Sequence, residues 1–319
     1  MKKTAFWTAI FLLLLGSTAL AFQMQTGYYV GAGATRSITG VGFRPDLVII
    51  KADTSVGRAV WKSSSMTDGT TAYFENTVVN TGGLITSLDS DGFSLATGAD
   101  VNSKDIRYTW TAFRSSTGSN FAVGKYSGSG IDNTKITTGF QPDLVWIKRN
   151  GVSQGLWASS AMAANANQYF AGNTGSASNK IKSPFETDGF KVGNDTEINE
   201  IGSDYYYVAF KQVTGSMAVG TYSGNGLDDQ SITVGFKPDL VWLKQSFAVA
   251  ADDAAMRNNQ NNGDTCNRFT NNNNVTNNIQ ALETNGFQIG TDTRVNSAVG
   301  GQNTYYYVAF KGATTPTPS

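Results

Sequence analysis

Histidine is absent from all 319 residues of this chain, and this narrows the chemistry that its side chains can perform. Without an imidazole there is no Ser-His or Cys-His nucleophile pair, no histidine general base and no histidine ligand for zinc or copper. Carboxylate pairs, lysine, tyrosine and a bound hard cation remain as means of catalysis. We assign no catalytic residue, no metal site and no cofactor from the sequence.

Neighbouring acidic residues are the best candidates for carboxylate chemistry, and they occur at Asp228-Asp229, at Asp252-Asp253 and at Glu197 with Glu200. Glycosidases need two carboxyl groups at a fixed separation, which spacing along a β-rich sequence does not establish. Each pair occurs in one part of the chain only, so a solvated edge is favoured. Asp89-Ser90-Asp91-Gly92 begins like a calcium loop but lacks the later acidic ligands, and a turn without metal is favoured there.

A pattern with a period of about 97 residues organises these side chains. Its clearest segment is Gly-Phe-x-Pro-Asp followed by an apolar strand and a lysine, at residues 42–51, 139–148 and 235–244. A period of this length exceeds that of a solenoid unit and is typical of a small domain. The sequence therefore predicts three tandem domains of one fold.

Each repeat has the residues of strands and turns, without sustained helical periodicity. The strand after each proline is apolar on both faces, which predicts burial on both sides, against its own core and against a neighbouring domain. Asp-Gly or Asn-Gly turns follow, and an aromatic strand closes each repeat. The carboxylate after each proline is expected to accept N–H groups of the turn rather than to catalyse. These three residues are Asp46, Asp143 and Asp239.

The expected fold is all-β, with three tandem antiparallel β-sandwich (jelly-roll-like) domains after a cleaved signal peptide. The joins from Arg114 to Asn120 and from Lys211 to Ser216 are short and lack proline. They favour a semi-rigid rod or a compact cluster over a flexible string. The expected boundaries are 1–21 for the signal peptide, 22–116, 117–213 and 214–312 for the repeats, and 313–319 for a Thr/Pro tail.

The first 21 residues predict export. Lys2 and Lys3 precede a short apolar run, and Ala19-Leu20-Ala21 provides a cleavage site, which favours a signal peptide over an uncleaved anchor. No later segment approaches a membrane span. Without the two lysines the chain has 22 basic and 24 acidic side chains, a balance that argues against nucleic acid as a partner. Cys266 is the only cysteine, and its asparagine-rich surroundings indicate an incidental surface residue.

Aromatic and amide side chains are the candidates for binding. Trp146 and Trp242 replace Ile49 of the first repeat, so packing is favoured for them. The asparagine-rich tract at 258–278 can hydrogen-bond sugar hydroxyls or cap a subunit contact, although a solvated, variable loop is favoured. Six further rings form a candidate ligand or interface surface, with packing again the favoured alternative. They are Trp61, Trp157, Tyr205, Tyr207, Tyr305 and Tyr307.

The order of motifs resembles a known module. Gly-x-Tyr-x-Gly-x-Gly occurs at 124–130 and 220–226, the Gly-Phe-x-Pro segment follows, and Tyr-x-Ala-Phe closes the unit at 207–210. The repeat is similar to a module of unknown function found in bacteriophage tail and virion-associated proteins and in some bacterial exported proteins. This resemblance implies an all-β, non-enzymatic structural or host-contact unit without catalytic residues. The signal peptide departs from a virion protein and indicates an exported cellular relative.

The leading hypothesis is therefore an exported, non-catalytic structural or adhesion protein of the cell surface or extracellular space. Its expected partners are glycans, other surface proteins or further copies of itself. The first alternative is a carbohydrate-binding module protein, because shallow aromatic and amide surfaces suit sugars. The second is a carboxylate-dependent polysaccharide-active enzyme.

Overall fold

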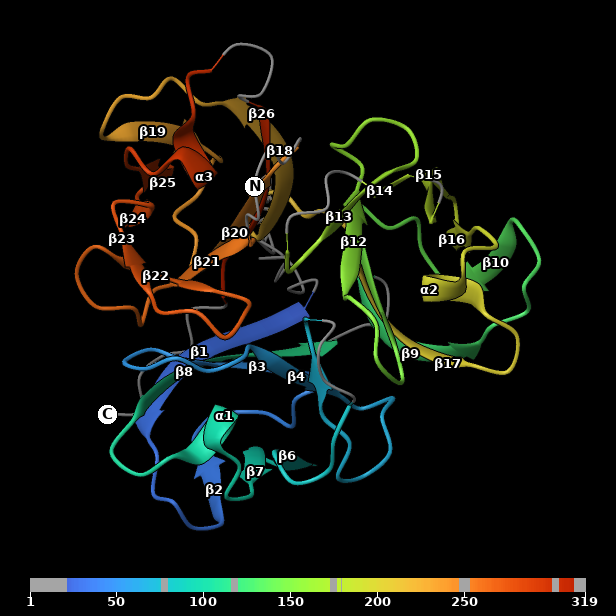
Figure 1. Ribbon diagram of the computed structural model, residues 1–319, viewed down its shortest axis with the longest axis horizontal. Coiled ribbons are helices and arrows are strands. Elements are labelled where there is room, and N and C mark those ends of the chain that lie inside the picture. The colour runs from blue at the N-terminus through green and yellow to red at the C-terminus, as the bar shows by residue number, and fades with distance from the viewer. Residues whose placement is uncertain are drawn as a thin grey trace, which may run out of the picture.

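The computed structural model describes residues 22–75, 80–115, 120–172, 177–178, 180–246, 253–299 and 304–312. The predicted signal peptide and the Thr/Pro tail lie outside these residues. Every repeat contains one large antiparallel sheet, one three-stranded antiparallel sheet and one short helix, which confirms the all-β prediction. The three repeats form three lobes around a common centre (Figure 1).

Repeat 1 has the large-sheet order β1-β8-β3-β4-β5 and the small-sheet order β2-β7-β6. The large sheet consists of β1 (Phe22–Val30), β8 (Arg107–Ser115), β3 (Leu47–Ala52), β4 (Val60–Ser63) and β5 (Ala72–Tyr73). The small sheet consists of β2 (Arg36–Thr39), β7 (Gly92–Leu95) and β6 (Ile85–Asp89), and the helix is α1 (Ala99–Asn102).

Repeats 2 and 3 reproduce this order with one more short strand at the sheet edge. Repeat 2 has β14 (Ala177–Ser178), β13 (Ala166–Tyr169), β12 (Leu156–Ser159), β11 (Leu144–Arg149), β17 (Asp204–Phe210) and β9 (Phe121–Ser127), then β10 (Thr134–Thr137), β16 (Gly189–Val192), β15 (Ile181–Glu186) and α2 (Thr196–Asn199). Repeat 3 has β18 (Met217–Ser223), β26 (Thr304–Phe310), β20 (Leu240–Gln245), β21 (Ala255–Asn258), β22 (Thr265–Arg268) and β23 (Val275–Thr276), then β19 (Gln230–Thr233), β25 (Gly286–Ile289), β24 (Ile279–Glu283) and α3 (Thr293–Asn296).

The strand after each proline is buried on both faces, as its apolar composition predicts. In β3, Val48 and Ile50 belong to the core between the two sheets of repeat 1. Leu47 and Ile49 point the other way, into a core that residues of all three repeats share. Each large sheet therefore packs on its own small sheet with one face and on the neighbouring repeats with the other.

The shared core is a column of aromatic rings, here called the axial core. Phe74, Phe170 and Phe269, one from each repeat, form a triad with ring centroids 4.7, 4.8 and 4.9 Å apart. A second triad, at 4.9 to 5.2 Å, is formed by Phe113, Phe210 and Phe310. Between the triads lie the buried indoles of Trp61, Trp146, Trp157 and Trp242. The packing role favoured for Trp146 and Trp242 is thus confirmed.

A closed circuit of six backbone hydrogen bonds surrounds the first triad, and we call it the backbone ring. Each phenylalanine of the triad donates its N–H to a small residue of its own repeat, and that residue donates to the phenylalanine of the preceding repeat around the ring. The three bonds between repeats are Gly155 N to Phe74 O (2.9 Å), Ala254 N to Phe170 O (3.0 Å) and Ala59 N to Phe269 O (3.0 Å). The last bond joins repeat 1 to repeat 3, so the repeats form a closed cluster and not a rod.

Candidate functional site

The six aromatic residues proposed as a binding surface all lie in the interior. Trp61 and Trp157 are fully buried in the axial core, where the repeats meet. The four tyrosines expose at most 8% of their surface. A ligand therefore does not reach these rings in the closed molecule.

The tyrosines of the closing strands hold local structure together. The Tyr205 hydroxyl accepts a hydrogen bond from Glu200 N and donates one to Thr196 O, both at 2.8 Å, so it fastens both ends of α2. Tyr305 makes the same two bonds at α3. Tyr207 covers Gly124 of the edge strand, where a Cβ would lie 2.4 Å from the ring. Tyr307 covers Gly220 in the same way, so these rings fill the space that each glycine leaves.

Sequence reasoning missed a buried asparagine that ends the short helix of every repeat. Asn199 accepts a hydrogen bond from Ser129 N (2.8 Å) and donates to Ile131 O (2.9 Å) and Gly193 O (2.6 Å). Asn102 and Asn296 make equivalent bonds in the other repeats. These asparagines recur in the sequence at intervals of 97 residues, a signal that could have identified them. They hold the loop after the first strand of each lobe.

The aspartate after each proline is an acceptor, as predicted, but its donors lie elsewhere. Asp143 accepts a hydrogen bond from Gln212 N (2.7 Å), just beyond the closing strand β17. Asp46 accepts from Ser115 N (2.9 Å) and Asp239 from Gly312 N (2.8 Å). These carboxylates therefore fix the point where the chain leaves each repeat, and not the turn that contains them.

The asparagine-rich tract corrects the expectation of a solvated loop. The Asn261 amide donates to Asp53 Oδ1 (2.6 Å), and the Asn274 amide donates to the same oxygen (3.2 Å). Arg107 forms an ion pair with Asp53 and donates to Gln260 O (2.6 Å). We call these five residues the closure network. Because Asp53 and Arg107 belong to repeat 1, the tract forms the contact that closes the ring between repeat 3 and repeat 1.

Three residues of the candidate acid pairs, Glu197, Glu200 and Asp228, are engaged with protein donors. Glu197 accepts from Tyr169 and Lys180, Glu200 pairs with Arg149, and Asp228 accepts from Gln280. Asp252 lies outside the described residues. Asp91 accepts from Gly40 N and Gly42 N, which makes its segment a turn held by hydrogen bonds. In the described part of the chain, no three His, Cys, Asp or Glu side chains are grouped to hold a metal ion.

One pocket of about 300 Å³ lies at the junction of the repeats and contains two carboxylates, Glu75 and Asp253. Both have structural partners. Glu75 forms an ion pair with Arg58, while Asp253 accepts from Gly172 N (2.8 Å) and from Thr270 Oγ1 (2.5 Å). The bond from Gly172 N to Asp253 therefore ties repeat 2 to repeat 3.

Cys266 is fully buried, which overturns its expected place on the surface. Burial raises the pKa of its thiol to about 12, and the thiol donates to Asn278 Oδ1 (3.3 Å). Because the thiolate is the reactive form, we expect a disulfide reagent at pH 8 to label native Cys266 at least about 100-fold more slowly than the urea-unfolded chain. Ser160 is exposed directly after β12, so the added cysteine of a Ser160→Cys variant provides a fast-reacting control. Equal rates at the two cysteines would contradict this burial.

Two buried lysines give the stability a specific pH dependence. Burial lowers the pKa of Lys51 and of Lys148 to about 8. The Lys148 ammonium donates to Gly151 O (2.9 Å) and Ser153 O (2.6 Å). Unfolded lysine titrates near pH 10.4, so between pH 8 and 10.4 the unfolded chain binds more protons and stability rises with pH.

We therefore expect the free energy of unfolding of the natural chain, relative to Lys148→Met, to increase by about 2 kcal/mol from pH 7 to pH 10. Urea unfolding of both proteins at the two pH values measures this difference. Because the variant is subtracted, the titration of all other groups cancels. Parallel behaviour of the two proteins would show that Lys148 keeps its ordinary pKa.

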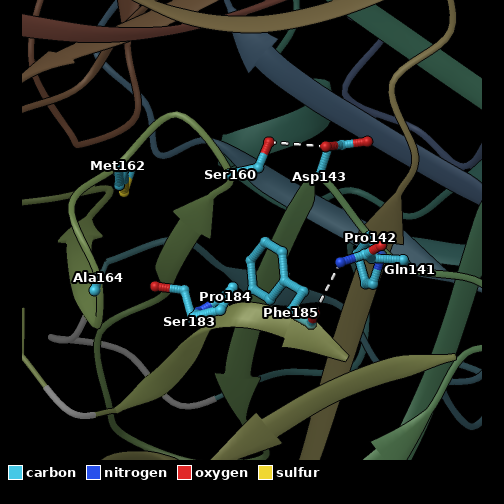
Figure 2. A pocket seen from close by; sticks show the side chains of 9 residues that line it. All are labelled: Gln141, Pro142, Asp143, Ser160, Met162, Ala164, Ser183, Pro184 and Phe185. Atoms are coloured by element: carbon cyan, nitrogen blue, oxygen red, sulfur yellow. Dashed lines mark hydrogen bonds between the residues drawn. The ribbon is translucent and has the colours of Figure 1, made fainter. Parts of the chain in front are cut away.

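The accessible concave site of repeat 2 lies between its Pro-Asp turn and β15, and we call it the repeat 2 pocket (Figure 2). Its volume is about 240 Å³. Ser160 Oγ donates to Asp143 (2.8 Å), and the ring of Phe185 points toward this pair. The remaining lining residues are Gln141, Pro142, Met162, Ala164, Ser183 and Pro184.

Repeat 1 has a pocket of about 190 Å³ at the matching place, the repeat 1 pocket. Ser64 and Met66 take the positions of Ser160 and Met162, and Leu88 takes that of Phe185. Ser87 and Ser183 lie in the matching strands β6 and β15. Its other lining residues are Arg44, Lys62, Ser63 and Asp68. Sequence reasoning missed both pockets because their lining comes from separate segments, the Pro-Asp turn, the turn after β4 or β12 and the strand β6 or β15, which only the fold brings together.

Comparison with known proteins places the chain in a family. The family described as "Domain of unknown function (DUF7483)" matches three times, at residues 22–124, 116–221 and 213–316. The chain therefore belongs to this family and consists of three tandem copies of its domain. No curated protein and no solved structure matches the chain. In the described residues, no helix has the length and apolar character needed to cross a membrane.

Proposed function

We propose that this protein is an exported, non-catalytic structural or adhesion element that presents three lobes in a fixed arrangement. The observation that carries this proposal is the backbone ring around the axial core. A closed ring of hydrogen bonds and a common core fix the lobes relative to one another. Preorganised sites on one rigid body lose little entropy when several of them bind one surface, so such a ring suits multivalent attachment.

The pattern of residues 1–21 supports export, and the buried lone cysteine is compatible with an oxidising compartment because it has no partner to join. The test is to express the full chain in a bacterium, fractionate the culture and sequence the N-terminus of the product. We expect a chain that begins at Phe22, on the cell surface or in the medium. Retention in the cytoplasm with residues 1–21 attached would refute export.

Electron microscopy of the purified product separates structural from adhesive roles. Fibres or lattices would favour a structural element, whereas single three-lobed particles that attach to surfaces would favour an adhesin. Carbohydrate binding is the second candidate function. The observation that favours it is the presence of matching, partly polar pockets in repeats 1 and 2.

A further inference from the structure

We propose that the repeat 1 and repeat 2 pockets are saccharide subsites, and that the repeat 1 pocket prefers an acidic sugar unit. This inference rests on the adhesion role proposed above and names the ligand class for it. The core of each lobe and the axial core are excluded as binding surfaces because they are buried, and the closure network is excluded because its side chains bind one another. The two pockets are matching concave sites that lie on the surface of two separate lobes.

The residues that the two pockets share define the ligand. Each pocket has a serine bonded to the Pro-Asp turn, a second serine in β6 or β15, a methionine, and one larger apolar side chain, Leu88 or Phe185. A hydroxyl both donates and accepts, so the serines match the neighbouring hydroxyls of a sugar. Leu88 and Phe185 are buried and form the apolar floor of each pocket. Volumes of about 190 and 240 Å³ lie below the range of drug-sized sites and suit a single sugar ring.

One position at the rim separates the two pockets by charge. In repeat 2, Gln141 Nε2 donates to Phe185 O (2.9 Å), and in repeat 1, Arg44 Nε donates to Leu88 O (3.2 Å). The carbonyl of the same wall residue therefore fixes both side chains at the same place. Within the described residues the Arg44 guanidinium has no ion pair, so its remaining N–H groups are available to a carboxylate.

The other charged groups also differ between the two pockets. Lys62, whose ammonium donates to Thr67 O (3.0 Å) and Thr70 O (2.9 Å), adds a second positive charge to the repeat 1 pocket. Two carboxylates balance these charges, that of Asp68 in the lining and that of Asp46, which accepts from the lining residue Ser64 (3.2 Å). The repeat 2 pocket contains Asp143 and no cation. The repeat 1 pocket is therefore the less negative of the two, so a uronate unit is favoured there over repeat 2.

Repeat 3 uses the corresponding turn for another purpose. Asn261 occupies the place of Met66 and Met162 in the backbone pattern, and its amide donates to Asp53 of repeat 1. Asn259, at the place of Ser160, donates to Asp239 (2.7 Å). The turn that borders a pocket in the other repeats thus closes the ring here, and the proposal covers two subsites only.

The experiment measures retention of the full chain on neutral polysaccharides (a glucan and a mannan) and on uronate polymers (pectate and alginate). Arg44→Gln and Gln141→Arg exchange the rim residues between the pockets, both at exposed positions. Arg44→Gln is expected to weaken uronate binding about fivefold, and Gln141→Arg to strengthen it by a similar factor. Ala164→Phe, which fills the repeat 2 pocket, is expected to weaken retention on the neutral polymers and to spare the uronate polymers.

Unchanged thermal unfolding of the three variants is the control for folding. Failure of the natural chain to bind any of the four polymers would overturn the proposal, as would binding that none of the three variants alters. The adhesion role has a separate outcome. If Ala164→Phe and Arg44→Gln are exported and still attach to surfaces as the natural chain does, adhesion stands and the saccharide subsites are refuted.

Discussion

Replacing Phe170 by alanine is expected to lower the free energy of unfolding by about 3 to 5 kcal/mol. The residue is fully buried, and its ring lies 4.7 Å from Phe74 of repeat 1 and 4.9 Å from Phe269 of repeat 3. The loss combines the transfer energy of the ring with the cavity that the surrounding sheets, tied by the backbone ring, cannot close. Urea unfolding followed by tryptophan fluorescence measures it.

A double-mutant cycle tests whether this stability comes from contacts between repeats. It uses leucine in place of alanine, because leucine substitutions destabilise the protein less. Phe170→Leu and Phe269→Leu touch in the triad, so we expect a coupling of about 0.5 to 3 kcal/mol. The matched control is Phe190→Leu with Phe287→Leu, equivalent residues that pack on Tyr207 and Tyr307 in separate lobes. This pair is expected to be additive within about 0.5 kcal/mol. Additivity of both pairs would mean that the lobes unfold independently.

The sequence predicts the lobes well because their signals are local. Asp-Gly turns, prolines at strand entries and aromatic closing strands recur in register through three repeats, and each is explained by backbone chemistry within a few residues. The apolar strands even predict burial on both faces. What they do not contain is the identity of the covering surface. That surface is supplied by residues such as Phe74 and Phe269, which follow short strands in the least similar part of each repeat.

Burial also explains why the sequence placed candidate binding residues at rings that lie in the interior. Tyrosine and tryptophan are equally good at covering a glycine, fastening a helix or stacking on a sugar, and Tyr207 and Trp61 do the interior work here. The asparagine-rich tract misleads for the opposite reason. Its average polarity indicates a solvated loop, whereas Asn261 is buried because its acceptor, Asp53, lies 208 residues away in sequence. Long-range pairs of polar groups leave no local pattern.

The closure network leads to the second large expected effect. Asp53→Ala is expected to lower the free energy of unfolding by about 3 to 5 kcal/mol, because it leaves the Arg107 guanidinium and the Asn261 amide without their buried acceptor. Asn150 provides the matched control, since its N–H makes the same strand-end bond to Asp204 O (2.8 Å) that Asp53 makes to Arg107 O, but its side chain is exposed. Asn150→Ala is expected to change stability by no more than about 0.5 kcal/mol.

The consequence of Asp53→Ala for assembly follows from the geometry of the ring. Repeat 3 meets repeat 1 through a contact that no peptide bond enforces, and a head-to-tail contact of this kind forms open chains when it does not close on itself. The buried ion pair and amides accept only one arrangement, because any other leaves charged and polar groups unpaired. We therefore expect Asp53→Ala to form larger, concentration-dependent oligomers than the natural chain in size-exclusion chromatography with light scattering, while Asn150→Ala keeps the oligomeric state of the natural chain. A destabilised Asp53→Ala protein that keeps this oligomeric state would show that the axial core alone selects the closed ring.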